Sequence, residues 1–367
     1  MAKQSINDYL PDYVVAPGEV LEFELEMRGM TQTELAKRTG LTPKHVGALV
    51  NTKSAVTPET AIKLERAIGM PVQYWMNLET QYQEALARMA EHKRLTRDLD
   101  WLKRVPVAAM VRMGWLEADT DKKKQLVNVL RFFGIASVDQ WDDMWPNLSV
   151  AYRQHASHTT SAHAVSAWLR RGEIQASNID CAAFDRVKFR QSLDQIRALT
   201  NEHPEKFVPA MQKLCAMAGV AVVFVPSLPK MAVSGATRWL TPSKALIQLS
   251  LRYKTNDHLW FTFFHEAGHI LLHGKKELFL EGTNGLDPDK EHEANKFAEN
   301  ELLPPKRLEG FAKSHRISKS AVRKFAQELG IAPGIVIGQL QHKQLLPRSH
   351  CNDLKQRLEW KSQLVAT

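Results

Sequence analysis

The sequence predicts a multidomain, mainly α-helical protein with a small β-sheet in its C-terminal part. Its 367 residues are enough for two or three domains. Residues that typically start helices recur in the N-terminal part, at Thr31, Thr42 and Thr57. The stretch from Leu259 to Leu272 is apolar nearly all round a helix, which indicates a buried helix, and a short β-type run at Ala245–Ser250 precedes it.

The N-terminal segment contains two short helices joined by a tight turn. Residues 31–34 (TQTE) form a capping box that starts the first helix, and Gly40 ends it. Thr42 and Pro43 supply an N-cap and a proline at the first position of a second helix, which continues to Val50. Further short helices flank the pair. This is the layout of a helix-turn-helix DNA-binding domain.

Charge supports a contact between this segment and DNA phosphates. Between positions 35 and 58 there are four Lys or Arg and no acidic residue. The candidate contact residues are Gln32 for a phosphate, Lys44 and His45 for base edges in a major groove, and Asn51. The competing interpretation is a protein-docking module without an operator. Because a single helix-turn-helix domain binds DNA weakly, we expect a homodimer on double-stranded operator DNA.

The middle of the chain shows helical patterns without a chemical motif. Leu78–Arg104 is a charge-rich helical stretch, and residues 105–200 contain several tryptophans at helical spacing, which indicates core packing. We therefore expect a helix-turn-helix domain over residues 1–85 and a helical connector over 86–200. A third domain over 201–345 and a basic tail over 346–367 follow.

Residues 265–269 (HEAGH) carry the main chemical motif. His265 and His269 lie about 400° apart round an α-helix, so both imidazoles leave the same face and suit two ligands of a tetrahedral zinc site. Glu266 can hydrogen-bond a water on the zinc and take its proton during attack on a peptide carbonyl. Two unpartnered core histidines are the competing interpretation, but burying them without a metal would be costly. The cysteines are scattered, which indicates a reducing compartment and no cysteine-rich metal site.

The third zinc ligand is expected from an acid on a following helix. Glu291 lies on the apolar stripe of that helix and should face the core, whereas Glu293 lies on a more peripheral side. We therefore favour Glu291 as the ligand, with Glu293 as runner-up. Asn295, one turn further on, could hydrogen-bond a ligand histidine. His273 and His292 are alternative ligands, although His273 more simply ends the helix.

These motifs resemble those of the ImmA/IrrE family of metallo-endopeptidases. The similarity spans about residues 150–345 and rests on segments 234–240, 245–250, 265–274 (HEAGHILLHG), 291–298 (EHEANKFA) and 302–305 (LLPP). The resemblance implies a zincin-like α+β domain in which His265, His269 and Glu291 hold Zn²⁺ and Glu266 is the catalytic base. It also implies a cytoplasmic enzyme that cleaves a helix-turn-helix repressor and so relieves repression of stress or mobile-element genes.

Two functions follow from these patterns. The segment from about residue 10 to residue 85 resembles the HigA-like antitoxin and phage-repressor class in the spacing of its helices. With the peptidase resemblance, this predicts a DNA-binding transcriptional regulator whose zinc endopeptidase cuts a protein partner or itself when a signal arrives. The alternative is an antitoxin-like DNA-binding regulator whose zinc domain senses or binds a partner without proteolysis. Glu266 discriminates between them, because only the first function needs a catalytic base.

Two expectations concern the substrate. If Ala245–Ser250 were an edge strand, an extended substrate could pair with it, but the pattern fits an ordinary core strand as well. Arg238 could stabilise an oxyanion, and a surface or salt-bridging arginine is an equal alternative.

The net charge of +9 is concentrated near the C-terminus. Residues 306–367 hold twelve Lys or Arg against four Asp or Glu. The pattern of Ser318–Leu340 predicts two amphipathic helices. These helices could form a second basic surface for nucleic acid or an acidic partner, or they could complete the peptidase fold. A solvated helical face is the favoured interpretation.

The longest apolar run, about residues 216–226, is too short to span a bilayer, and no signal peptide opens the chain. We therefore expect a cytoplasmic protein without membrane contact.

Overall fold

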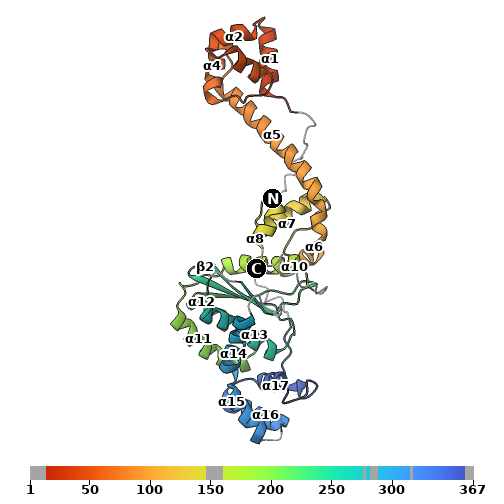
Figure 1. Cartoon of the computed structure of the whole chain (residues 1–367), viewed down its shortest axis with the longest axis vertical. Coiled ribbons are helices and arrows are strands. Elements are labelled where there is room, and N and C mark those ends of the chain that lie inside the picture. Colours follow the sequence, from red (N-terminus) through yellow and green to blue (C-terminus); the bar gives the residue numbers. More distant parts are fainter. Residues whose placement is uncertain (1–13, 146–159, 276–277, 282–287, 315–316, 360–367) are drawn as a thin grey trace. The chain divides into compact units, whose positions relative to one another are not determined.

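The computed structural model describes residues 14–145, 160–275, 278–281, 288–314 and 317–359. The chain is divided into two compact units, Met1–Leu99 and Asp100–Thr367. Figure 1 shows that the elements of both units are mostly helices and that the second unit adds one small sheet. The predicted fold class is confirmed.

In the described part of the first unit, the regular elements are all helices. They are α1 (Pro17–Met27), α2 (Gln32–Thr39), α3 (Pro43–Val50), α4 (Pro58–Ile68) and α5 (Val72–Asp98). The threonines that were expected to start helices do so: the side-chain oxygens of Thr31, Thr42 and Thr57 accept the backbone N–H three residues on, at 3.1, 3.1 and 3.3 Å. Gly40 ends α2 in the left-handed conformation, with φ of 68°, which produces the tight turn into α3.

Apolar side chains from all five helices form the core of the first unit. Trp75 is fully buried at the start of α5. The core also includes Leu21 and Leu25 of α1, Leu35 of α2, Val46 and Leu49 of α3, and Leu64 of α4. The pair α2 and α3 is therefore held at a fixed angle by its neighbours, as a helix-turn-helix requires.

The boundary between the units falls within the 3₁₀ turn η1 (Leu99–Lys103). The second unit then continues with the helices α6 (Val107–Arg112), α7 (Lys122–Phe133), α8 (Asp139–Met144) and α10 (Ala162–Ser177). The tryptophans that were expected to pack in a core, Trp115, Trp141, Trp145 and Trp168, are all buried. Trp168 also donates its indole N–H to Val225 O at 2.9 Å, which ties α10 to the sheet that follows.

A four-stranded mixed sheet organises the rest of this unit. Its strands are β1 (Val220–Phe224), β2 (Gly235–Thr241), β3 (Lys244–Leu249) and β4 (Phe279–Glu281), in the order β1-β3-β2-β4. β1 is parallel to β3, whereas β2 is antiparallel to both β3 and β4. Helix α10 covers one face of the sheet (Figure 1).

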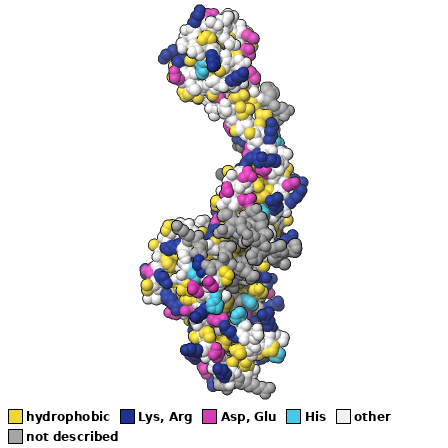
Figure 2. All heavy atoms as spheres, viewed as in Figure 1, with side chains coloured by type: hydrophobic (Ala, Val, Ile, Leu, Met, Phe, Trp, Pro, Cys, Tyr) yellow, Lys and Arg dark blue, Asp and Glu magenta, His cyan; other side chains and the backbone are white. Residues whose placement is uncertain are grey.

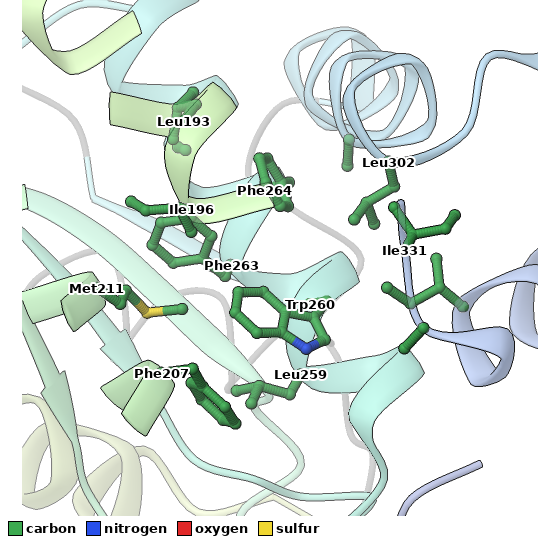
Figure 3. Packing of buried hydrophobic residues seen from close by; sticks show 14 of the residues in the cluster. Leu193, Ile196, Phe207, Met211, Leu259, Trp260, Phe263, Phe264, Leu302 and Ile331 are labelled. Atoms are coloured by element: carbon green, nitrogen blue, oxygen red, sulfur yellow. The ribbon is translucent and has the colours of Figure 1, made fainter. Parts of the chain in front are cut away.

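The opposite face of the sheet carries the main hydrophobic core. The helices on this side are α11 (Arg186–Ala198), which continues into the 3₁₀ turn η2 (Leu199–Asn201), α12 (Pro204–Met217), α13 (Asn256–Leu272) and α14 (Pro288–Leu302). Figure 3 shows Trp260, Phe263 and Phe264 of α13 among side chains of α11 and α12. Helix α13 is thus enclosed by the sheet and by other helices. Cys181, Cys215 and Cys351 are free, as their spacing predicts.

The C-terminal helices complete this core. They are α15 (Pro305–Ser314), α16 (Lys319–Leu329) and α17 (Pro333–His342), and a 3₁₀ turn η3 (Asn352–Leu354) follows. The two helices predicted within Ser318–Leu340 are confirmed. Helix α17 packs so closely on α13 that a Cβ on Gly338 would lie 2.7 Å from Asp257 Oδ2, and Ile335, Val336 and Ile337 are buried. Because α17 is mostly buried, it completes the fold of this unit and presents neither the solvated face favoured from the sequence nor a basic surface.

Arg197 connects the ends of two helices through their carbonyls. Its guanidinium donates to Glu301 O and Leu302 O at the end of α14, at 2.8 and 3.1 Å, and to Leu329 O at the end of α16, at 3.0 Å.

Replacing Arg197 with Ala should lower the free energy of unfolding of this unit by about 2–3 kcal/mol, because charged hydrogen bonds to half-buried carbonyls are lost. Urea unfolding followed by tryptophan fluorescence measures this, with the exposed Arg186→Ala on the same helix as control. Equal midpoints for the two variants would show that the contact is not stabilising.

None of the helices among the described residues combines the length and the apolar character that crossing a membrane requires.

Candidate metal centre and nucleic-acid interface

Helix α13 places the HEAGH residues in the interior of the second unit. It begins after Thr255, whose backbone is extended, and ends where the His273 N–H donates to His269 O at 3.1 Å. His265, Glu266 and His269 are 1%, 0% and 1% exposed. The buried helix predicted from the apolar pattern is confirmed.

Helix α14 brings a carboxylate to the two histidines. Glu291 Oε2 lies 3.3 Å from His265 Nε2, and its Oε1 lies 3.4 Å from His269 Nε2. The two Nε2 atoms are 3.0 Å apart, so the three side chains form a group that could hold a metal ion. The Glu293 side chain is 62% exposed, against 18% for Glu291, and contacts His273 instead. The structure thus brings together the ligand set favoured from the sequence and leaves Glu293 outside it.

The donor atoms fit an ion of the zinc type. Ligands at 2.0–2.1 Å from a tetrahedral centre lie about 3.3 Å from one another, which is close to the observed separations of 3.0–3.4 Å. His265 Nδ1 lies 3.0 Å from Asn295 Oδ1, which can only accept, so Nδ1 carries a proton and, in the neutral ring, Nε2 keeps a lone pair. Two imidazole nitrogens and a carboxylate, all electron-pair donors, therefore converge on one point. Asn295 occupies the supporting position expected for it.

Electrostatics favour the metal-binding forms of Glu291 and His269. Burial acts to raise the pKa of Glu291, but the hydrogen bonds and charges of His265 and His269 outweigh it and lower this pKa to about 2. The pKa of His269 is lowered, chiefly by burial, although Glu291 opposes the shift. Metal ions compete with protons for ligand atoms, so lowered pKa values favour metal binding at neutral pH.

Close backbone packing holds Glu266 in place. A Cβ on Gly235 of β2 would lie 2.6 Å from Glu266 Oε1 and 2.6 Å from Thr262 Cγ2, so only glycine allows the strand this near. Thr237 donates its hydroxyl to Glu266 O at 3.1 Å. The residue types of Gly235 and Thr237 do not indicate a role near Glu266. Their segment, residues 234–240, drew attention in the sequence only because it resembles the metallo-endopeptidase family.

Arg238 lies on the other face of β2. It forms an ion pair with Glu173 of α10 and packs 5.6 Å from the Trp145 ring centroid. Since side chains alternate along a strand, Gly235 and Thr237 face α13 and Arg238 faces α10. The structure does not bring Arg238 to the histidine cluster. Of the roles considered for this arginine, the salt bridge is the one observed, and stabilisation of an oxyanion at the cluster is not supported.

β3 is an interior strand of the sheet. It pairs with β1 on one side and with β2 on the other, so it offers no free edge to a substrate. The alternative of an edge strand at Ala245–Ser250 is therefore wrong, and the alternative of an ordinary core strand is confirmed.

In the first unit, the residues proposed for DNA contact lie on α2, on α3 and just after α3. Gln32 is exposed on the first turn of α2, and its Oε1 would lie 3.5 Å from a Cβ on Gly47 of α3. Lys44 is exposed and His45 half-buried on the first turn of α3. Asn51 donates its amide to Gly47 O at 2.6 Å, which caps the end of α3. Figure 2 shows Lys and Arg side chains interspersed with acidic ones on the visible face.

Two family models match the chain. One, described as helix-turn-helix, matches residues 21–75, and the other, described as an IrrE N-terminal-like domain, matches residues 217–337. The first match includes α2, α3 and α4 of the first unit, and the second includes the sheet and the helices α13 and α14 that carry the histidine cluster.

Individual relatives match about a fifth of the chain. Virulence-associated protein I of Dichelobacter nodosus is 32% identical over 74 residues, which are 20% of this chain and 68% of that protein. The uncharacterized HTH-type transcriptional regulator YddM of Escherichia coli is 34% identical over 71 residues, 19% of this chain and 76% of that protein. Among solved structures, an addiction module antidote protein of the HigA family from Coxiella burnetii is 28% identical, covering 23% of this chain and 92% of that one, with a TM-score of 0.22. Pseudomonas aeruginosa antitoxin HigA with its higBA promoter is also 28% identical, covering 23% and 95%, with a TM-score of 0.22.

Proposed function

Because the chain belongs to the helix-turn-helix family through residues 21–75 and carries an IrrE N-terminal-like domain over residues 217–337, we propose that it is a DNA-binding transcriptional regulator with a zinc-dependent endopeptidase centre. The observation that supports the endopeptidase most directly is the convergence of His265, His269 and Glu291, with Glu266 buried on the same helix. Three protein ligands leave a fourth tetrahedral position open, which is the arrangement of catalytic rather than structural zinc.

Each side chain has a role in peptide hydrolysis. Zn²⁺ bound there would supply Lewis acidity and lower the pKa of a water. Glu266 takes a proton from the attacking water and delivers it to the leaving amine, the work of a general base and then a general acid. Asn295 accepts from His265 Nδ1 and so holds its Nε2 toward the cluster.

The proposed substrate is a regulatory protein, either a helix-turn-helix repressor or the chain itself. A DNA-binding domain in the same polypeptide would concentrate the peptidase where such regulators are bound. The test is to incubate the full chain, loaded with one equivalent of Zn²⁺, alone and with helix-turn-helix repressors, and to identify fragments by mass spectrometry. Fragments should form, and 1,10-phenanthroline should prevent them.

If no protein is cut, the endopeptidase assignment is wrong. The alternative function then applies, in which the metal domain senses or binds a partner and the helix-turn-helix unit acts as an antitoxin-like regulator. Retained metal binding without fragments would identify this outcome.

DNA binding is proposed to depend on the first turn of α3. Lys44→Ala should weaken operator binding about tenfold and reduce the slope of log K against log salt by about 1, because one cationic contact is lost. The control is Lys63→Ala, which removes a lysine paired with Glu59 on α4, outside the pair of helices. Operator fragments are selected from random DNA and titrated by fluorescence anisotropy at several salt concentrations, which measures both the affinity and the salt slope. Light scattering tests the expected homodimer. If the two variants bind alike, α3 is not the reading helix.

A further inference from the structure

His269 makes a second contact that leads from the candidate metal centre to the protein surface. Its Nδ1 lies 2.9 Å from His273 Nδ1, and His273 Nε2 lies 3.1 Å from Glu293 Oε2. We propose that Glu293 and His273 form a hydrogen-bonded relay that orients His269 and sets its tautomer for metal binding. This inference rests on the proposed function only in that a metal binds at the cluster; it does not require proteolysis.

The direction of each hydrogen bond in the relay follows from one condition. If His269 Nε2 presents a lone pair to a metal, its single ring proton must lie on Nδ1. Nδ1–H then donates to His273 Nδ1, which accepts and so must carry its own proton on Nε2. His273 Nε2–H in turn donates to the Glu293 carboxylate. Every ring nitrogen of the two histidines thus has one defined role.

Packing holds both rings in the orientation that the relay needs. Phe279 of β4 stacks on His269 with centroids 4.0 Å apart and an interplanar angle of 16°, and it also lies 5.2 Å from the His273 ring. The His273 side chain is only 3% exposed, although its residue ends α13. His273 is therefore a positioning residue, because its Nδ1 contacts His269 Nδ1, which is not the ligand atom, and its Nε2 contacts Glu293.

The two ligand histidines are supported by different chemistry. His265 donates to the neutral amide oxygen of Asn295, whereas His269 is linked through His273 to a carboxylate. A carboxylate at the end of such a chain increases the basicity of the imidazole that binds metal. Because Glu293 is mostly exposed, water weakens its contribution, and His273 should matter more than Glu293.

Zinc affinity tests the relay directly. Competition with a chromophoric chelator should show that His273→Phe, which keeps a ring but removes the acceptor, weakens zinc binding by about 10–100-fold. Glu293→Leu should weaken it about tenfold or less, and Glu293→Gln, which keeps an acceptor oxygen, should lose less than Glu293→Leu. The double variant His273→Phe/Glu293→Leu should bind like His273→Phe alone, because the two residues act in series. His292 was an alternative ligand from the sequence, but the structure leaves it exposed and outside the ligand group. His292→Ala is therefore the matched control and should bind like the wild type.

Two measurements separate the relay from a general effect on folding. Circular dichroism of the metal-free variants shows whether they fold. Glu293→Leu changes an exposed side chain that does not pack in the core, so it should leave the fold intact. Long-range ¹H–¹⁵N spectra of the zinc-loaded wild type should show His269 protonated on Nδ1 and His273 on Nε2.

The outcomes distinguish this inference from the proposed function. Zinc affinity unchanged in both His273→Phe and Glu293→Leu, additive losses in the double variant, or the opposite tautomers would overturn the relay while leaving the metal centre intact. A wild-type chain that binds no zinc would instead overturn the metal centre itself, and the relay with it. If the chain binds zinc but cleaves no protein, the endopeptidase assignment fails, while the zinc-affinity and tautomer measurements still test the relay.

Discussion

Replacing Glu266 with Gln should lower the rate of peptide cleavage by about 10²–10⁴-fold while the zinc content remains at the wild-type level. General acid–base catalysis contributes a factor of this size, and an amide cannot take the proton. Glu266 lies outside the cluster of ligand atoms, so its loss does not remove a metal ligand. Gln has nearly the same shape, so it should fit the space between β2 and α13. Initial rates on an identified substrate, with metal content measured on the same samples, provide the test.

Two comparisons make the Glu266 result specific. Glu309→Gln, at an exposed position of α15, should cleave like the wild type. Thermal melting should show Glu266→Gln to be at least as stable as the wild type, because a neutral amide is less costly to bury than a carboxylate. Equal cleavage by the wild type and Glu266→Gln would remove the basis for an enzyme.

His269→Ala should abolish both stoichiometric zinc binding and the stabilisation that zinc confers. A ligand that binds only the folded state stabilises it by about 2.7 kcal/mol at 100 times its Kd. For a unit of this size that is roughly 5–10 °C in Tm. The variant retains His265 and Glu291, and two ligands hold zinc far more weakly than three. Calorimetry with and without zinc measures the increment, and elemental analysis measures the stoichiometry.

The increment, rather than the absolute Tm, is the informative quantity. His269 is buried, so its truncation also leaves a cavity that lowers stability with or without metal. Subtracting the metal-free Tm of each variant removes this effect. His292→Ala should keep the full increment. A full increment in His269→Ala would mean that zinc binds elsewhere in the chain.

Local rules were sufficient for the helices and for the residues that share a helix face. The threonine caps at 31, 42 and 57 act within three residues of themselves, so the sequence alone reveals them. The periodicity of 3.6 residues puts His265 and His269 on one face of α13, and it turns Glu291 and Asn295 inward while Glu293 faces outward. These are short-range consequences of helix geometry.

Contacts between distant segments could not be read in the same way. Whether β3 is an edge or an interior strand depends on its pairing with β1 and β2, and the pattern of apolar residues is the same in both cases. The orientation of Arg238 toward Glu173 follows from which face of the sheet α10 covers. Sequence spacing does not determine that choice.

The sequence by itself determined the helix-turn-helix, the HEAGH helix and the acid best placed to join it. Each depends on helical geometry and capping within a few residues. Only the tertiary structure decided that Gly235 packs against Glu266, that α17 is covered by α13, and that His273 connects His269 to Glu293. These contacts join residues brought together by chain folding, where sheet register and helix packing rather than local propensity select the partners.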